Sequence, residues 1–156
     1  MGLLVGPTPW WQASIVSRCP EGTYLPDGST IICKSGGTAW IVAPFCTQVS
    51  SSWAGGQYNT TLVGDKCCIC EWSTLETQLI NCCFNPTDWF VPSSSQLQNP
   101  GFVCRTNWDS FSSVNYWSST ECNATLACNV CNSNGIACCN SKTCINLVRA
   151  FRCVTY

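Results

Sequence analysis

Cysteine is the most abundant intrinsically reactive residue type in this sequence. The 156 residues include sixteen cysteines and no histidine, and only 10% of them are charged. Without histidine the ordinary Ser-His and Cys-His pairs of nucleophilic catalysis cannot form. A carboxylate pair such as Glu71 and Glu76 would not share one face of a helix, because residues five positions apart diverge. We therefore predict no catalytic residues, and keep a thiol-dependent enzyme as a distant alternative.

The cysteines fit two kinds of chemistry. A content of this size is typical of disulfide-bonded proteins in oxidising surroundings, although spacing alone does not assign the pairs. Alternatively, Cys67-x-x-Cys70 and Cys128-x-x-Cys131 could supply four thiolates to zinc. The separation between these two pairs is much longer than in compact zinc modules. We predict that most cysteines are oxidised, with no metal and no cofactor.

Charge and hydropathy narrow the range of partners. The formal net charge is −1 and the seven Lys and Arg residues are scattered, which argues against nucleic acid as a partner. No apolar run reaches the ~18 residues of a membrane span, so we expect no membrane insertion. Eight Trp residues on a chain with so few charges indicate neighbouring subunits, and a homo-oligomer is one such assembly.

We expect no secretory signal in the first residues, because "MGLLVGPTPWWQ" lacks a basic region and its apolar run ends at a proline. An oxidised chain without a signal is explained by folding in a cytoplasm and release by lysis, as in a virus particle. The expected location is therefore a virion surface or the extracellular space. Residues 1–18 have no apolar period and are predicted to be an assembly arm, with Trp10 and Trp11 as contacts to a neighbour. Residues 19–156 are predicted to form the domain.

Short strands at both ends of this domain enclose a helical middle. "STIICK" and "TAWIVAP" predict two short strands, and "CEWSTLETQLINC" has the spacing of an amphipathic helix. Ser93 and Gln96 have the spacing of a capping box, so a second short helix should begin there and stop at Asn99-Pro100-Gly101. "YWSSTE", "LACNVCN" and the closing "LVRAFRCVTY" are predicted strands. This order predicts an α+β domain whose two ends pair in one sheet.

Two segments carry a family resemblance. "DWFVPSSSQL" resembles a Trp-x-x-Pro-Ser/Thr-x-x-Glu/Gln-Leu element, and "YWSSTE" with the terminal "VRAFR" resembles the closing half, of the Lcl C-terminal-like and FISUMP family of C-type-lectin-like domains. The resemblance covers about Gly36 to Val154. It implies a C-type-lectin-like fold with short strands, one or two helices and long loops. Such domains form ligand-binding tips of bacterial adhesins and of phage tail fibres or decoration proteins.

The resemblance also implies roles for individual residues. The aromatic rings of "YWSSTE" would be structural, and Ser118 to Glu121 would satisfy loop backbone and cap neighbouring strands. Asn107-Trp108-Asp109 contains the residue types of a lectin calcium site in a different order, so we expect an ordinary turn. The buried frame would comprise Trp89, Pro92, Leu97, Trp117, Val148 and Phe151.

The segment from Cys122 to Asn146 alternates Asn, Cys and small residues and allows two interpretations. It is either a variable binding surface or a polar sheet edge held by disulfides. The candidate ligand-binding residues are Asn123, Asn129, Asn132, Asn134, Asn140 and Asn146. The leading hypothesis is a non-enzymatic virion structural and attachment protein that contacts other virion subunits and a host-surface glycan or protein. The alternative is a secreted or cell-surface lectin-like adhesion module.

Overall fold

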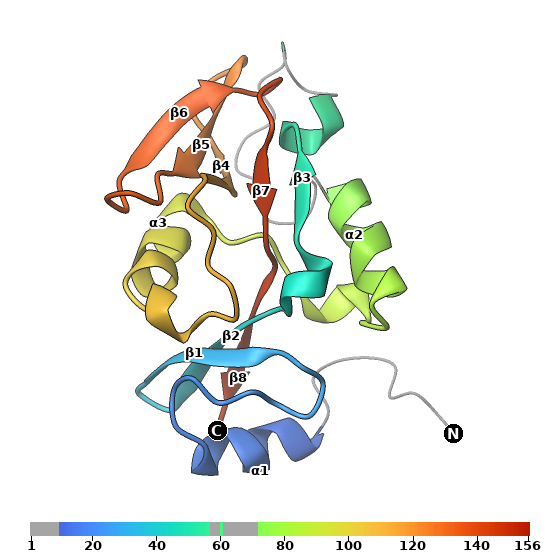
Figure 1. The fold of residues 1–156 in the computed structure, drawn as a ribbon, viewed down its shortest axis with the longest axis vertical. Helices are drawn as coiled ribbons and strands as arrows, with labels where there is room; N and C mark the ends of the chain where they lie inside the picture. Colours follow the sequence, from blue (N-terminus) through green and yellow to red (C-terminus); the bar gives the residue numbers. More distant parts are fainter. Residues whose placement is uncertain (1–9, 57–59, 61–71) are drawn as a thin grey trace.

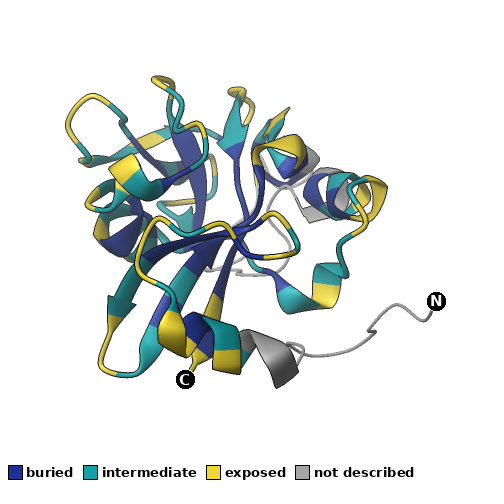
Figure 2. Cartoon of the chain, turned by 60° about the horizontal axis from the view of Figure 1, so that its bottom comes forward, coloured by how far each residue is buried: buried dark blue, intermediate teal, exposed yellow. Residues whose placement is uncertain are grey.

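The computed structural model describes residues 10–56, 60 and 72–156, and this part of the chain contains eight strands in two sheets with few helices (Figure 1). The α+β class predicted from the sequence is therefore confirmed. Buried residues gather on the strands that cross the centre of the molecule, and exposed ones lie on loops and outer helix faces (Figure 2).

The first sheet joins the two ends of the domain. Its order is β1 (Thr30–Ser35), β2 (Thr38–Val42) and β8 (Phe151–Thr155), with antiparallel neighbours. Gly36 and Gly37 form the two-residue hairpin loop with φ angles of 58° and 81°. Two successive positive φ angles define the turn that matches strand twist, and glycine adopts them without a Cβ clash. The two predicted strands and the predicted pairing of the chain ends are both present, and the two strands form a hairpin.

The second sheet has the order β3-β7-β4-β5-β6. Its strands are β3 (Val49–Ser51), β4 (Tyr116–Glu121), β5 (Leu126–Val130), β6 (Ala137–Ser141) and β7 (Asn146–Val148). The prediction of one closing strand over "LVRAFRCVTY" was wrong, because β7 and β8 belong to different sheets. Between them, the Ala150 carbonyl accepts a hydrogen bond from the Ala43 amide at 2.9 Å, which takes the chain from one sheet to the other.

In the described part of the chain, helices pack against the sheets at three places. They are α1 (Trp10–Arg18), α2 (Trp72–Asn81) and α3 (Ser94–Gln96). The predicted amphipathic helix corresponds to α2, and both hydrogen bonds of the predicted capping box between Ser93 and Gln96 are present. Helical turns continue over Leu97–Phe102, with a break in helical geometry at Asn99 rather than the predicted stop. Short 3-10 turns occupy Phe45–Thr47, Trp53–Gly56, Pro86–Asp88 and Arg105–Asn107.

Helix α1 corrects the predicted boundary between arm and domain. Val16 is fully buried in the main core, and Ala13 and Ile15 pack against that core. The Lys34 ammonium donates hydrogen bonds to the carbonyls of Val16 at 2.7 Å and Cys19 at 2.9 Å, so it satisfies the C-terminal end of the helix. Residues 13–18 are thus part of the folded domain. Residues 1–9 and the side chains of Trp10 and Trp11 lie outside the described residues.

The core consists of two adjoining hydrophobic clusters. All six side chains predicted to form the frame are buried, and the two largest, Trp89 and Trp117, are 4% and 1% exposed. Trp117 shares the main cluster with Trp53, whereas Phe151 packs with Trp108 and Tyr116 in the second. No helix in the described residues is long and apolar enough to cross a membrane.

Candidate functional site

Strand β4, which carries "YWSSTE", is a structural joint between three segments. The Trp117 indole donates to the Ser51 carbonyl at 2.8 Å, and the Ser118 hydroxyl donates to the Cys128 carbonyl at 2.7 Å. The Ser119 amide donates to the Pro92 carbonyl, and the Thr120 hydroxyl accepts from the amide that opens α3. These bonds tie β4 to β3, to β5 and to the start of α3. The side chains that could have formed a reaction centre therefore hold the fold together.

Glu121 differs from the role that the resemblance implied. Its carboxylate forms an ion pair with the Lys142 ammonium at 2.5 Å, and both side chains are almost fully buried. Lys142 also donates to the Ala124 carbonyl at 2.9 Å and lies 4.8 Å from the centre of the Trp53 ring. The ion pair fixes the β6–β7 connection against β4, so Glu121 acts as a buried anchor rather than as a strand cap.

A second buried cation organises the region between the sheets. The Arg149 guanidinium donates to the Asp109 carboxylate, to the Ala43 carbonyl at 2.6 Å and to the Gln48 amide oxygen at 3.2 Å. The Tyr116 hydroxyl donates to the same Gln48 oxygen at 2.7 Å. Burial lowers the pKa of Arg149, and the nearby carboxylate of Asp109 acts in the opposite direction by raising this pKa.

Asn107 and Asp109 have structural contacts of the kind expected for a turn. The Asn107 amide group donates to the Ile32 carbonyl at 2.9 Å, and Asp109 also accepts from the Phe45 amide at 2.8 Å. Arg152 lies 3.4 Å from Asp27 and 3.8 Å from Asp88. Asp27, Asp88 and Asp109 therefore each form an ion pair with an arginine of the same chain.

The six candidate asparagines do not share one surface. Asn129 is fully buried, so it cannot contact an external ligand, and its place in the predicted binding set was wrong. Asn123 and Asn134 are exposed, and each side-chain oxygen accepts backbone amides of its own turn. Asn132 donates to the carbonyls of Ser112 and Val114, whereas Asn140 and Asn146 are half-buried. Only the turns before and after β5 present exposed members of the set.

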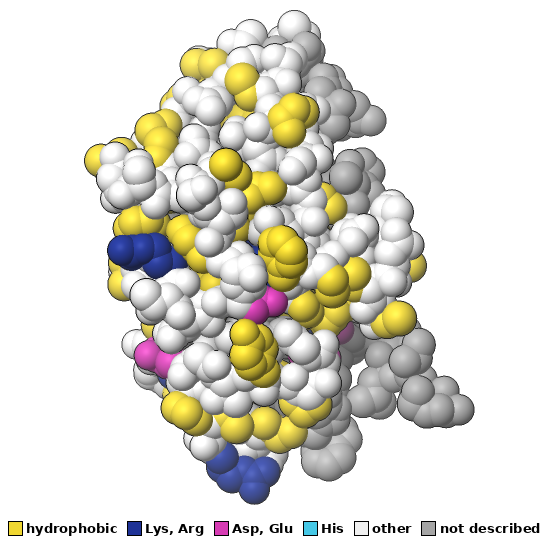
Figure 3. Space-filling view, viewed as in Figure 1, with side chains coloured by type: hydrophobic (Ala, Val, Ile, Leu, Met, Phe, Trp, Pro, Cys, Tyr) yellow, Lys and Arg dark blue, Asp and Glu magenta, His cyan; other side chains and the backbone are white. Residues whose placement is uncertain are grey.

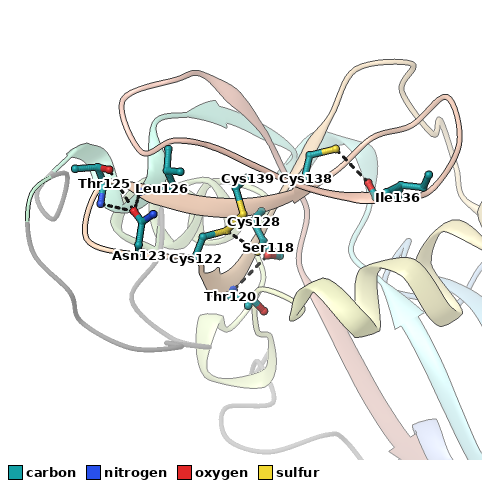
Figure 4. The surroundings of a disulfide bond; sticks show 10 residues. All are labelled: Ser118, Thr120, Cys122, Asn123, Thr125, Leu126, Cys128, Ile136, Cys138 and Cys139. Carbon is teal, nitrogen blue, oxygen red and sulfur yellow. Dashed lines mark hydrogen bonds between the residues drawn. A yellow bond between two sulfur atoms is a disulfide. The ribbon is translucent and has the colours of Figure 1, made fainter.

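Three cysteines meet on one face of the β4–β5–β6 sheet (Figure 4). Cys122 forms a disulfide with Cys139, and the Cys128 sulfur lies 2.9 Å from the Cys122 sulfur. Cys128 and Cys139 are direct cross-strand neighbours on β5 and β6. All three sulfur atoms lie within 4.8 Å of one another, and Cys139 is exposed. We call this set the three-cysteine cluster.

The two cysteines of the Cys128-x-x-Cys131 motif have different sulfur neighbours. The Cys131 and Cys138 sulfur atoms are 2.9 Å apart, so Cys131 has a different neighbour from Cys128. A hydrogen bond with Cys138 raises the pKa of the Cys131 thiol. The predicted zinc alternative required both members of this motif at one site. The other motif, with Cys67 and Cys70, lies outside the described residues.

Two further cysteine pairs join segments that are distant in the sequence. The thiols of Cys33 on β1 and Cys104 interact by a hydrogen bond, and burial raises the pKa of Cys104 to about 12. Cys82, just after α2, donates to the Cys46 carbonyl at 3.1 Å, and burial raises its pKa to about 11. No regularity of spacing could have identified these pairs, because each depends on how two separate elements dock.

Charged side chains are sparse on the one face of the described residues that Figure 3 shows. Most of the face seen in Figure 3 is uncharged, with apolar side chains spread across it. Exposed large apolar residues include Tyr24 at 64%, Phe45 at 51% and Ile136 at 56%. Comparison with protein-family models and with curated proteins gives no match for this chain.

Proposed function

We propose that this protein is a non-enzymatic structural and attachment protein of a virion surface, of the tail-fibre or capsid-decoration type, built on a C-type-lectin-like domain. The observation that carries the proposal is the pairing of β8 with the β1–β2 hairpin while the preceding C-terminal strands form a separate sheet. Joined N- and C-terminal strands, long loops and few helices are what the family resemblance implies. This arrangement supports the C-type-lectin-like part of the proposal.

The interior supports a scaffold role rather than catalysis. The described carboxylates of Asp27, Asp88, Asp109 and Glu121 lie in ion pairs with buried Lys or Arg side chains. A general acid or base needs access to a substrate proton, and these groups contact the protein's own cations. Their arrangement favours a rigid framework that presents loops.

The surface indicates where partners would bind. A low density of charge with exposed apolar side chains favours contact with other subunits, either copies of this chain or other virion proteins. The turns around Asn123 and Asn134 are held by their own hydrogen bonds, and they flank β5 at its two ends. We assign these two turns to the contact with a host-surface glycan or protein.

Light scattering after size-exclusion chromatography tests the assembly part. The full chain is expected to form a defined oligomer, and a Trp10→Ser/Trp11→Ser variant should shift it toward monomer. An Arg18→Ser variant is the control, because it removes an exposed polar side chain from the same helix, α1. A full chain that is monomeric would contradict the virion-assembly proposal and favour the secreted or cell-surface adhesion module.

Binding to intact host cells tests the attachment part. Ser133→Lys places a charge in the turn after β5, and Ser95→Lys places the same charge on exposed α3. The first variant should weaken binding by about tenfold or more, whereas the second should stay within about twofold of the unmodified protein. Equal loss in both variants would contradict the assignment of the turns.

A further inference from the structure

We propose that strand β6 is a docking edge for a second copy of this chain, and that the two β6 strands pair antiparallel about a two-fold axis at Cys139. β6 is an edge strand of the five-stranded sheet in the described residues, and it lies at the outer side of the molecule in Figure 1. The edge strands of the other sheet each have a further bridge, from Tyr24 to β1 and from Phe90 to β8. The inference rests on the assembly proposed above, and it names the surface and the partner of one contact.

Two hydrogen bonds at the ends of the β5–β6 ladder determine which way the backbone groups of β6 point. The Cys131 amide donates to the Ile136 carbonyl at 3.0 Å, and the Lys142 amide donates to the Thr125 carbonyl at 2.9 Å. The register between these two bonds is continuous, and hydrogen-bonded pairs alternate with non-hydrogen-bonded pairs along an antiparallel ladder. Every second residue from Ile136 onward therefore directs its N–H and C=O toward β5.

The remaining residues of β6 direct their backbone groups away from the sheet. They are Ala137, Cys139 and Ser141. Such an outward row of donors and acceptors is a template for another strand. Because the three residues are spaced symmetrically about Cys139, an antiparallel second copy centred there meets the row along its whole length. Cys139 then pairs with Cys139 of the second copy, and Ala137 pairs with Ser141 of the second copy.

The composition of β6 suits pairing with a copy of itself. Natural edge strands avoid such pairing by means of charged side chains, proline or a bulge. The strand, Ala137–Ser141, contains neither a charged residue nor proline, and its register with β5 has no bulge. The adjacent cation, Lys142, is buried in its ion pair with Glu121. Two copies of β6 can therefore meet without bringing like charges together.

Exposed apolar side chains lie beyond both ends of β6. Ile136, at 56% exposure, directly precedes the strand, and Ile145, at 65%, follows the turn in which the Cys144 amide donates to the Ser141 carbonyl. In an antiparallel pair the start of one strand lies beside the end of the other. Each Ile136 therefore approaches the turn that carries Ile145 in the second copy. Burial of these side chains adds apolar contact to the backbone hydrogen bonds of the paired edges.

Residue-resolved hydrogen exchange of the full chain tests the pairing directly. The outward amides of β6, at residues 137, 139 and 141, should exchange at least about tenfold more slowly in the oligomer than in the diluted monomer. The amides of Cys138 and Asn140 face β5 and should be protected in both states. Equal exchange of the outward amides in both states would overturn the proposal. Protection of the Cys139 amide already in the monomer would also overturn it, because another segment of the same chain would then cover this edge.

Two matched substitutions test the same surface by a second route. Ile136→Lys replaces an apolar contact beside β6 with a charge, and Ile80→Lys introduces the same charge on α2 at a residue that is also 56% exposed. Both are measured by light scattering over a concentration series in the Trp10→Ser/Trp11→Ser variant, where the smaller species that remains should be a dimer. Ile136→Lys should raise the dissociation constant of this dimer about tenfold or more, whereas Ile80→Lys should change it by less than about twofold. Equal effects of the two substitutions would overturn the proposal.

The outcomes separate this contact from the proposed function. An oligomer whose outward β6 amides exchange as fast as in the monomer would contradict the pairing and leave the virion-assembly proposal standing. A dimer with slowed β6 amides that Trp10→Ser/Trp11→Ser does not affect would support the pairing and contradict assembly through the first residues. A full chain that stays monomeric would contradict both, and loss of host-cell binding bears only on the proposed function.

Discussion

The buried Lys142–Glu121 pair gives the most informative test of how this interior is stabilised. The two side chains are 0% and 1% exposed and 2.5 Å apart, so water screens them very little. Removing one partner of such a pair leaves a buried charge without its main counter-ion, which typically costs ~3–5 kcal/mol. We therefore expect Glu121→Gln and Lys142→Met each to lower the free energy of unfolding by about that amount.

The two substitutions should not be additive. The double variant removes both charges, so it avoids the cost of burying either charge without its counter-ion. Its loss of stability should be at least ~2 kcal/mol smaller than the sum of the two single losses. Glu121→Gln should be the milder single change, because Lys142 retains the Ala124 carbonyl and the Trp53 ring as neighbours.

Urea denaturation of the oxidised protein, followed by Trp fluorescence, measures these differences. Arg105→Met is the matched control, because it removes a cation that is exposed, and it should change stability by less than ~0.5 kcal/mol. Single-variant losses below ~1 kcal/mol, or losses that add within ~0.5 kcal/mol, would refute the argument. Either result would mean that water or another group compensates the charges.

Three further predictions concern the core and the thiols. Trp117→Ala should lower the free energy of unfolding, measured by denaturation, by ~3–5 kcal/mol. Trp117→Phe should lower it by ~1–3 kcal/mol, because the Ser51 carbonyl loses its donor. A change within ~0.5 kcal/mol for Trp117→Ala would show that the ring is exposed. Beside the three-cysteine cluster, we expect the disulfides Cys33–Cys104, Cys46–Cys82 and Cys131–Cys138. Peptide mass mapping of the oxidised protein should find them, and each should add ~2–4 kcal/mol to the free energy of unfolding. Thiols at all of these positions would contradict the prediction. After reduction, the free energy of unfolding measured by denaturation should fall as pH rises above ~8.5. Burial raises the pKa of Cys82 to about 11 and that of Cys104 to about 12, so the unfolded chain loses these protons at lower pH than the folded protein does. The oxidised protein should not show this pH dependence.

Several parts of the fold could be predicted because their causes lie within a few residues. Two glycines fix the β1–β2 turn, and Ser93 with Gln96 closes the start of α3 by reciprocal hydrogen bonds. The apolar spacing of α2 likewise repeats within one helix. The aromatic side chains of "YWSSTE" and "DWFVPSSSQL" were predicted to be buried through the family resemblance, and Trp89 and Trp117 are buried.

Other features depended on partners that are distant in the sequence. The short α1 belongs to the domain because Lys34 caps it and Val16 reaches the core. The break between β7 and β8 depends on hydrogen bonds with the segment after β2, which no local pattern encodes. The burial of Asn129 also depends on distant partners, because the local sequence of β5 does not show which face of the strand packs against the rest of the protein.

The sequence by itself determined that this is an α+β chain with few charges, no histidine and abundant cysteine. Only the tertiary structure decided which cysteines are neighbours and which charges are buried together. The Arg149 side chain meets the carbonyl of Ala43 across 106 residues, and Lys142 meets Glu121 across 21. Composition and local spacing specify turns, caps and amphipathic faces, because those interactions act over a few positions. The pairing of thiols and ions follows only from the docking of whole elements, which brings distant positions within a few ångströms.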